Sequence, residues 1–107
     1  SYEQTHFAAE QKRDRLRLIG SQEGREGSVT IHQDVNLYAA TLTPGATVEH
    51  SLDKGRIAWL QVARGEVQLN EYALNAGDGV GINQTNGLRL KGLGSTPAEV
   101  LLFDMGG

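Results

Sequence analysis

The stretch IAWLQVARGEVQLNEYALNAGDG, residues 57–79, consists of three short runs rich in aliphatic, β-branched and aromatic residues. Gly65 separates the first run from the second, and a turn-forming segment that contains Gly77 and Asp78 follows the third. Short runs of this kind, divided by turn formers, predict antiparallel strands of a sandwich or barrel. We interpret the three runs as strands at 57–63, 66–70 and 72–74.

The first of these runs is apolar on both of its faces, because alternate residues of a strand point to opposite sides. Ala58, Leu60 and Val62 form one face, which is purely apolar and fits a barrel interior. The other face still carries Ile57 and Trp59. Strands with apolar residues on both faces are usually covered on both sides. We therefore expect something to lie over Trp59.

The same alternation of short runs and turns extends over most of the chain. Further candidate strands lie at 16–19, 28–32, 36–42, 47–52, 79–82, 88–91 and 99–103. Helical signals are confined to 7–17, where Thr5 could cap one short helix. We predict an all-β domain at 16–107, preceded by an N-terminal arm or interdomain linker at 1–15 that contains at most one short helix.

Composition narrows the classes of function. The chain has 107 residues, 38% of them hydrophobic and 21% charged, which is typical of one compact globular domain. Its net charge of −3 opposes nucleic-acid binding, which depends on several Lys and Arg side chains at phosphates. The absence of cysteine excludes disulfides and thiolate metal sites. No apolar run is long enough to span a bilayer, and we expect a cytoplasmic protein without nucleic-acid or membrane partners.

Gly45, Gly65 and the pair Gly77-Asp78 occur at the spacing of the glycines in the two cupin sequence motifs. With the segments 27–34, 37–38, 59–62 and 100–104, nearly the whole chain resembles the second half of pirin-type proteins. The resemblance implies a cupin jelly-roll barrel, or double-stranded β-helix. Bacterial proteins of this type act as quercetin 2,3-dioxygenases. They are bicupins, and the resemblance places the metal in their N-terminal barrel.

Cupin chemistry needs several side chains that converge on one metal ion. Counting from the motif glycines places the four ligand positions at Ser51, Asp53, Ala58 and Leu88. Only Asp53 has a carboxylate, whereas a catalytic metal usually has at least three protein ligands. We therefore expect these positions to be degenerate, with neither a metal nor a catalytic residue in this chain.

The three histidines lie far apart in the sequence, at positions 6, 32 and 50. His50 adjoins Ser51, and a slip of one residue would put its side chain on the other face of its strand. We interpret His50 as a surface or interface histidine rather than a metal ligand. His32 is interpreted as a hydrogen-bonded turn residue, and His6 as a solvated or docking residue of the arm. The three could still meet in space, although their spacing does not support a shared site.

The degenerate ligand positions favour a structural and interaction module over an enzyme. Its expected partner is the N-terminal cupin barrel of the same parent protein, with Tyr2, Ile57 and Trp59 as candidate interface residues. A homodimer would also cover an exposed apolar face. The alternatives are a stand-alone barrel that binds an apolar ligand such as a flavonol, with Leu60 and Val62 lining its interior, and catalysis in the context of the full-length protein.

Overall fold

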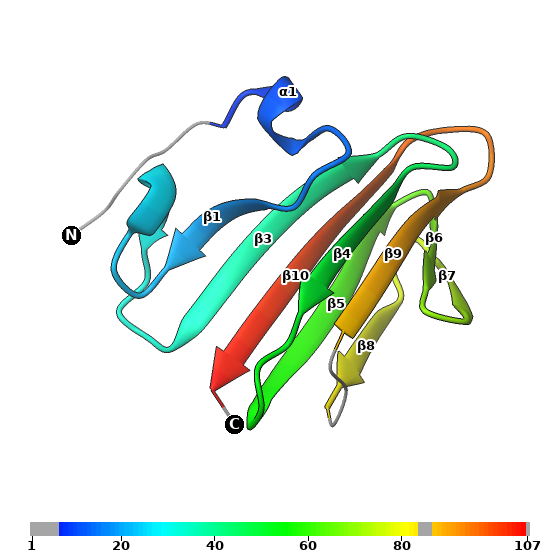
Figure 1. The fold of residues 1–107 in the computed structure, drawn as a ribbon. Coiled ribbons are helices and arrows are strands. Elements are labelled where there is room, and N and C mark those ends of the chain that lie inside the picture. The colour runs from blue at the N-terminus through cyan, green and yellow to red at the C-terminus, as the bar shows by residue number, and fades with distance from the viewer. Residues whose placement is uncertain (1–6, 84–86, 107) are drawn as a thin grey trace.

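A computed structural model describes residues 7–83 and 87–106, which form two β-sheets packed face to face (Figure 1). The larger sheet has the strand order β2 (Val29–Thr30), β1 (Arg17–Ser21), β3 (Val35–Leu42), β10 (Ala98–Gly106), β5 (Arg56–Arg64) and β8 (Gly79–Ile82). The smaller sheet has the order β4 (Thr47–Ser51), β9 (Gly87–Leu93), β6 (Glu66–Leu69) and β7 (Tyr72–Asn75). A helix, α1 (Ala9–Lys12), and a 3-10 turn, η1 (Arg25–Gly27), complete the described elements.

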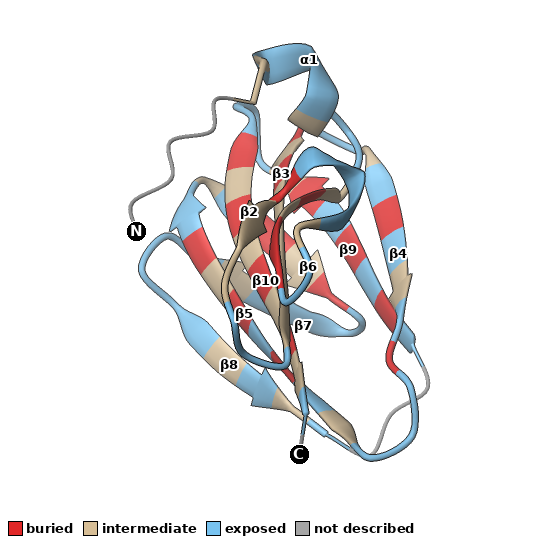
Figure 2. Cartoon of the chain, turned by 90° about the vertical axis from the view of Figure 1, so that its left-hand side faces the viewer, coloured by how far each residue is buried: buried red, intermediate tan, exposed pale blue. Residues whose placement is uncertain are grey.

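The core lies between the two sheets, and buried residues alternate with exposed or partly buried ones along β5 and β10 (Figure 2). Its largest fully buried side chains are mainly leucine and valine. The all-β jelly-roll prediction is confirmed. The described strands nevertheless form two separate hydrogen-bonded sheets, so the closed barrel that we expected is an open two-layer arrangement.

Gly65 allows the chain to leave the larger sheet and enter the smaller one. It lies between β5 and β6 with φ +74°, a conformation that L-residues with a side chain rarely adopt. A Cβ atom here would lie 2.9 Å from Ala98 Cα and 3.0 Å from the Pro97 carbonyl oxygen. This glycine of the first cupin motif is thus required by backbone packing.

The predicted strands are present, with changes at their ends. The 57–63 run becomes β5, and its residues Ala58, Leu60 and Val62 are buried, as the alternation predicted. The strand expected at 28–32 shrinks to the two residues of β2, and the left-handed backbone of His32 (φ +63°) follows it. Helix is limited to α1, and Thr5 lies outside the described residues.

The last part of the predicted arm is fixed to β3. The Asp14 N–H donates to the Thr41 carbonyl oxygen (2.7 Å), and the Asp14 carboxylate accepts hydrogen bonds from the backbone N–H and the hydroxyl of Thr43. The Arg17 guanidinium lies over the Phe7 ring, 5.0 Å from its centroid. In the part of the chain that the structure describes, no helix has the length and hydropathy needed to cross a membrane.

Candidate functional site

Two of the four predicted ligand positions point away from the core. Ser51 and Asp53 are exposed, whereas Val48 and Leu52 are buried and the side chain of His50 lies on the same side as theirs. The count from Gly45 is therefore out of phase by one residue along β4. The other two positions face the core as expected, because Ala58 and Leu88 are each only 2% exposed.

His50 was interpreted as a surface or interface histidine, but its side chain is largely buried within this domain. Its side chain is 13% exposed, and its Nε2 lies 2.7 Å from Oδ2 of Asp104, within hydrogen-bonding distance. The Tyr38 ring lies beside the imidazole, with 4.9 Å between the ring centroids and 59° between the ring planes. Asp104 is 5% exposed and lies on β10, directly opposite Ala58 on β5. A histidine–aspartate pair thus occupies the end of the core that cupin ligands would occupy.

Arg56 supplies the positive charge that this buried carboxylate needs. Its Nε donates to Asp104 Oδ1 (2.6 Å) and its Nη2 donates to the Asp104 carbonyl oxygen (3.0 Å). Its Nη1 donates to both oxygens of Asp34, at 3.0 and 3.1 Å. The hydrogen bond to Asp104 raises the pKa of Arg56, and partial burial opposes that effect. We call His50, Arg56, Asp104 and Asp34 the end network.

Tyr38 completes the surroundings of the end network. Burial raises the pKa of the Tyr38 phenol above its ordinary value of 10.0, and the negative charge of Asp104 adds to this effect. The folded state therefore keeps the Tyr38 proton at pH values where the unfolded chain has lost it. Protonated Tyr38 therefore contributes to the free energy of unfolding. This contribution is fully present below pH 10 and is lost as the pH rises through the raised pKa of folded Tyr38.

The direction of the Tyr38 pKa shift can be tested directly. The absorbance at 295 nm of the wild type minus that of Tyr38→Phe gives the titration of the Tyr38 phenol. We expect this phenol to ionise above pH 10 in the folded protein and near pH 10 in denaturant. The comparison of the wild type with the variant isolates Tyr38 from the other tyrosines. A Tyr38 transition at the same pH in both states would contradict the structural environment described above.

The donor set of the core does not fit a transition metal. Apart from Tyr38 and Asp104, the buried side chains at this end of the core are aliphatic and offer no metal ligand, namely Val48, Leu52, Ala58 and Leu88. His50 is bonded to Asp104, and the Arg56 guanidinium beside that carboxylate would repel a second cation. Within 7–83 and 87–106, no group of three His, Asp or Glu side chains could hold an ion. No reaction step through a metal can therefore be built on these residues.

Leu60 and Val62, the candidates for an interior pocket, are both 0% exposed and belong to the core cluster. Apolar side chains also cover the opposite, outward side of the larger sheet. Phe103 pairs in register with Trp59 on β5 and with Leu37 on β3, and Leu101 and Met105 flank it on the same side of β10. We call this surface the outer face, formed by Leu37, Ile57, Trp59, Leu101, Phe103 and Met105. Trp59 is 41% exposed and Ile57 is 39% exposed.

Trp59 has a fixed position on the outer face. Its ring lies against the glycines of β8, since a Cβ atom on Gly79 would lie 2.5 Å from Trp59 Cζ2 and one on Gly81 would lie 3.4 Å from Trp59 Cε3. The indole N–H donates to Gln61 Oε1 (3.2 Å), and the Gln61 amide donates to the Gly77 carbonyl oxygen. The sequence analysis missed this role of Gly79 and Gly81. The only signal for it is a Gly-x-Gly strand that pairs with the tryptophan strand.

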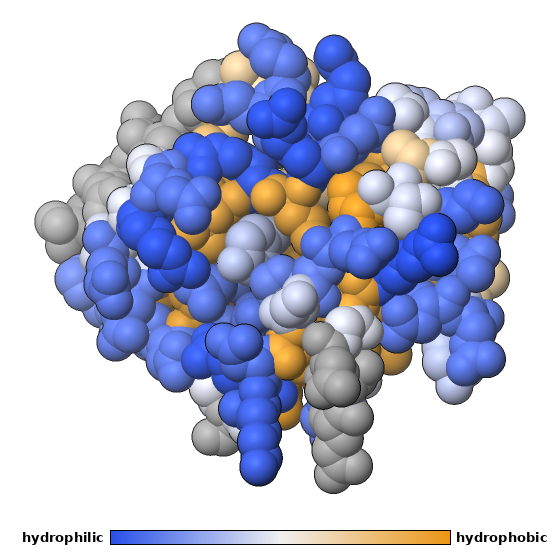
Figure 3. All heavy atoms as spheres, in the orientation of Figure 1, coloured by the Kyte–Doolittle hydropathy of each residue, from blue (hydrophilic) through white to orange (hydrophobic). Residues whose placement is uncertain are grey.

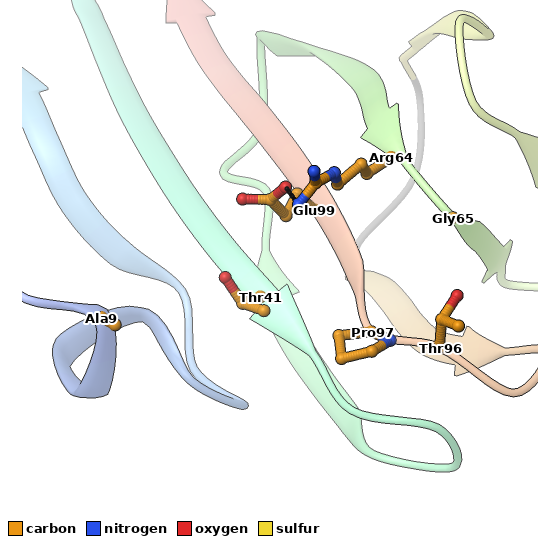
Figure 4. Close-up of a pocket in the computed structure, with 7 residues that line it drawn as sticks. All are labelled: Ala9, Thr41, Arg64, Gly65, Thr96, Pro97 and Glu99. Carbon is orange, nitrogen blue, oxygen red and sulfur yellow. Dashed lines mark ion pairs between the residues drawn. The ribbon is translucent and has the colours of Figure 1, made fainter.

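Two hollows of different chemistry lie on the outward side of the larger sheet. Trp59, Gln61, Leu101, Phe103 and Met105 line an open apolar hollow of about 380 Å³. A second hollow of about 480 Å³ lies at the end nearer α1 and is lined by Ala9, Thr41, Arg64, Gly65, Thr96, Pro97 and Glu99 (Figure 4). An ion pair joins Arg64 on β5 to Glu99 on β10, with 3.1 Å between Nη1 and Oε2 (Figure 4). The apolar surface thus ends in a polar rim.

The outward side of the smaller sheet is different. Its exposed residues include Glu49 on β4 and Arg89 and Lys91 on β9, which face outward in register. This side faces the viewer in Figure 3, where hydrophilic surface predominates. Gln68, Asn70, Arg89 and Lys91 line a small polar hollow there. Among the described residues, Ile57 and Trp59 of the larger sheet thus lie on a more apolar surface than Glu49, Arg89 and Lys91 of the smaller sheet.

Comparison with known proteins agrees with this fold. Residues 18–105 match the family model of the quercetinase C-terminal cupin domain. The chain is 33% identical over 104 residues to quercetin 2,3-dioxygenase of Escherichia coli K12, covering 97% of this chain but 43% of that protein. A solved structure of YhhW from Escherichia coli has a TM-score of 0.89 at 32% identity, covering 98% of this chain and 43% of that chain.

A second solved structure, of the bacterial pirin YhhW from Escherichia coli in complex with nickel(II), has a TM-score of 0.79 and 32% identity. It covers 85% of this chain and 39% of that chain. In each of these comparisons the chain spans less than half the length of its relative. The family model covers most of the chain and the resemblance noted from its glycines and strands is confirmed, so this chain belongs to the quercetinase-type C-terminal cupin domains of pirin-like proteins.

Proposed function

We propose that this domain is the metal-free, supporting C-terminal domain of a quercetin 2,3-dioxygenase-like protein, and that the metal and the oxidation chemistry belong to an N-terminal cupin barrel of the same polypeptide. The observation that carries the proposal is the donor set at the end of the core. Aliphatic side chains stand at Ala58 and Leu88, and His50, the inward-facing histidine among the described residues, is bonded to Asp104. Flavonol dioxygenation needs a redox-active or Lewis-acidic centre, which this set cannot hold.

The relatives support a division of labour between domains. One relative is named quercetin 2,3-dioxygenase and another was solved in complex with nickel(II), and the chain corresponds to 43% and 39% of their lengths. More than half of each relative therefore lies outside the part that this chain matches. A metal-bearing barrel in that remaining part is compatible with a domain whose own ligand positions are aliphatic.

Metal content and turnover of the purified chain test the proposal. After incubation with nickel, iron, copper or zinc and desalting, elemental analysis should find well below one ion per chain. The absorbance of quercetin should not decay with this chain, with or without added metal. One tightly held metal ion per chain, or steady loss of the flavonol, would show that the domain carries its own active centre.

A binding role without chemistry is the second candidate, and the apolar hollow beside Trp59 favours it. Trp59 is the single tryptophan of the chain, so its fluorescence reports on this hollow. In the same incubations, saturable quenching of Trp59 by quercetin without loss of flavonol would favour the binder. Unchanged Trp59 emission, after correction for absorption by the flavonol, favours the supporting domain.

A further inference from the structure

The small polar hollow on the outward side of the smaller sheet concentrates positive charge in an acidic domain. Arg89 and Lys91 on β9 line it together with Gln68 on β6 and Asn70, which follows β6, and its volume is about 140 Å³. It lies on the hydrophilic side that faces the viewer in Figure 3. The net charge of the chain is −3, so a hollow lined by two cations is a local feature and does not follow from overall composition.

The two cations of the hollow are close enough to repel each other. Arg89 and Lys91 are two residues apart on one strand, so both point outward and their Cα atoms lie about 7 Å apart. Neither forms an ion pair with a carboxylate in the part of the chain that the structure describes. Glu49 is in register with Arg89 but on the β4 side of β9, whereas the hollow lies on the β6 side. An anion between the two cations would offset their repulsion.

Asn70 fixes the opposite wall of the hollow. Its backbone is left-handed (φ +52°), a conformation that Asn adopts more readily than most residues. Its N–H donates to the Arg89 carbonyl oxygen (2.8 Å), and its Oδ1 accepts from the Arg89 N–H (2.9 Å). The Gln68 amide donates to the Asn70 carbonyl oxygen (2.8 Å). The wall is therefore held in place before any ligand binds, and since Oδ1 is engaged, the Asn70 amide nitrogen is the branch that remains to donate.

A phosphate group suits this set of donors. Arg and Lys are the usual side-chain partners of phosphate oxygens, and a dianion can satisfy both positive charges at once. Side-chain amides such as those of Gln68 and Asn70 also commonly contact phosphate oxygens. A monocarboxylate would leave one cation unpaired. The hollow, at about 140 Å³, is much smaller than the hollows of about 380 and 480 Å³ on the larger sheet, which favours a compact anion over a flavonol.

We propose that Gln68, Asn70, Arg89 and Lys91 form a binding site for a phosphate dianion, either inorganic phosphate or the phosphate group of a small phosphomonoester. Arg89 and Lys91 supply the charge, and the hydrogen bonds of Asn70 hold the site in shape. The proposal goes beyond the supporting role of the domain and does not depend on it, because the site uses neither the core nor a metal. Both cations are exposed, so we expect a dissociation constant of about 1 mM.

Nuclear magnetic resonance tests the site with inorganic phosphate as the probe. The ¹⁵N-labelled chain is titrated at constant ionic strength and at a pH of about 7.5, where phosphomonoesters are mainly dianions. Saturable shifts should be concentrated on the backbone amides of Asn70, Arg89 and Lys91. A parallel titration with glycerol 3-phosphate distinguishes the two sources of the phosphate group. Tighter binding of the ester would identify a phosphorylated small molecule as the ligand, and equal binding would identify the free anion.

Charge-removing substitutions give a matched comparison. Arg89→Gln and Lys91→Gln should each raise the phosphate concentration at half-saturation several-fold, and the double variant should raise it at least about tenfold. Lys54→Gln is the control, because it removes the same charge from an exposed position outside the hollow, and it should bind phosphate as the wild type does. Circular dichroism establishes that the variants fold.

Shifts that do not saturate would overturn the inference, as would equal weakening by Lys54→Gln and Arg89→Gln, because both results would indicate general screening of surface charge. Equal competition by acetate would contradict the need for a dianion. An oligonucleotide that binds where neither small phosphate does would make this surface a nucleic-acid contact instead. A chain that binds no metal and no phosphate separates failure of this site from failure of the proposed function.

Discussion

The Asp104→Ala variant should lose about 3 kcal/mol of unfolding free energy, the cost typical of breaking a buried ion pair from one side. Asp104 is 5% exposed and accepts hydrogen bonds from the Arg56 Nε atom at 2.6 Å. Its removal leaves His50 and a partly buried guanidinium without their shared carboxylate. Urea denaturation followed by circular dichroism measures the loss.

Asp34→Ala is the matched control, because Asp34 bonds to the same guanidinium from the other side. The Asp34 side chain is 61% exposed, and exposed ion pairs contribute about 1 kcal/mol or less. Comparing the stability lost in the two variants therefore separates the effect of burying the carboxylate from the effect of its bond to Arg56. Similar small losses in both variants would show that the end network contributes no more than surface charge does.

The second large effect is expected from Gly65→Ala, which should cost about 3 kcal/mol. About 1–2 kcal/mol comes from forcing a residue with a side chain into the left-handed conformation at φ +74°. The remainder comes from the new Cβ atom, which would meet backbone atoms of Ala98 and Pro97 at 2.9 and 3.0 Å. Backbone atoms cannot move aside as the end of a flexible side chain can. The same denaturation experiment measures this cost.

Gly45→Ala isolates the conformational part of that cost. Gly45 has φ +85°, but a Cβ atom there would find nothing within 4 Å. We expect a loss of about 1–2 kcal/mol, from the backbone conformation alone. If both alanine variants lost the same free energy of unfolding, the contact of the new Cβ atom with Ala98 would contribute nothing to the destabilisation.

The strands could be predicted from the sequence because their side chains alternate between the two faces with a period of two residues. The alternation in 57–63 correctly separated Ala58, Leu60 and Val62 from Trp59, because side chains of a strand repeat every two residues. Gly65 was recognisable because the turn between two such runs needs a glycine conformation. The start of β1 at Arg17 and the small extent of α1 were also close to expectation.

The end network could not be derived in the same way. His50 and Asp104 are 54 residues apart, and their contact depends on how β4 packs across from β10. The phase of β4 was recoverable, however, because Val48 and Leu52 flank His50 at even spacing and are both buried. The cupin ligand spacing counted from Gly45 conflicts with this alternation, because it predicts inward side chains at Ser51 and Asp53, which are exposed.

The hydrogen bonds between Asp14 and Thr43 have a consequence for affinity. They fix the segment that enters the domain to the end of β3, so that a polypeptide attached before α1 would be held close to this end of the larger sheet. A short tether corresponds to an effective concentration in the range of about millimolar. A contact made by a polypeptide attached in this way can therefore persist even where the same contact between separate molecules would be weak.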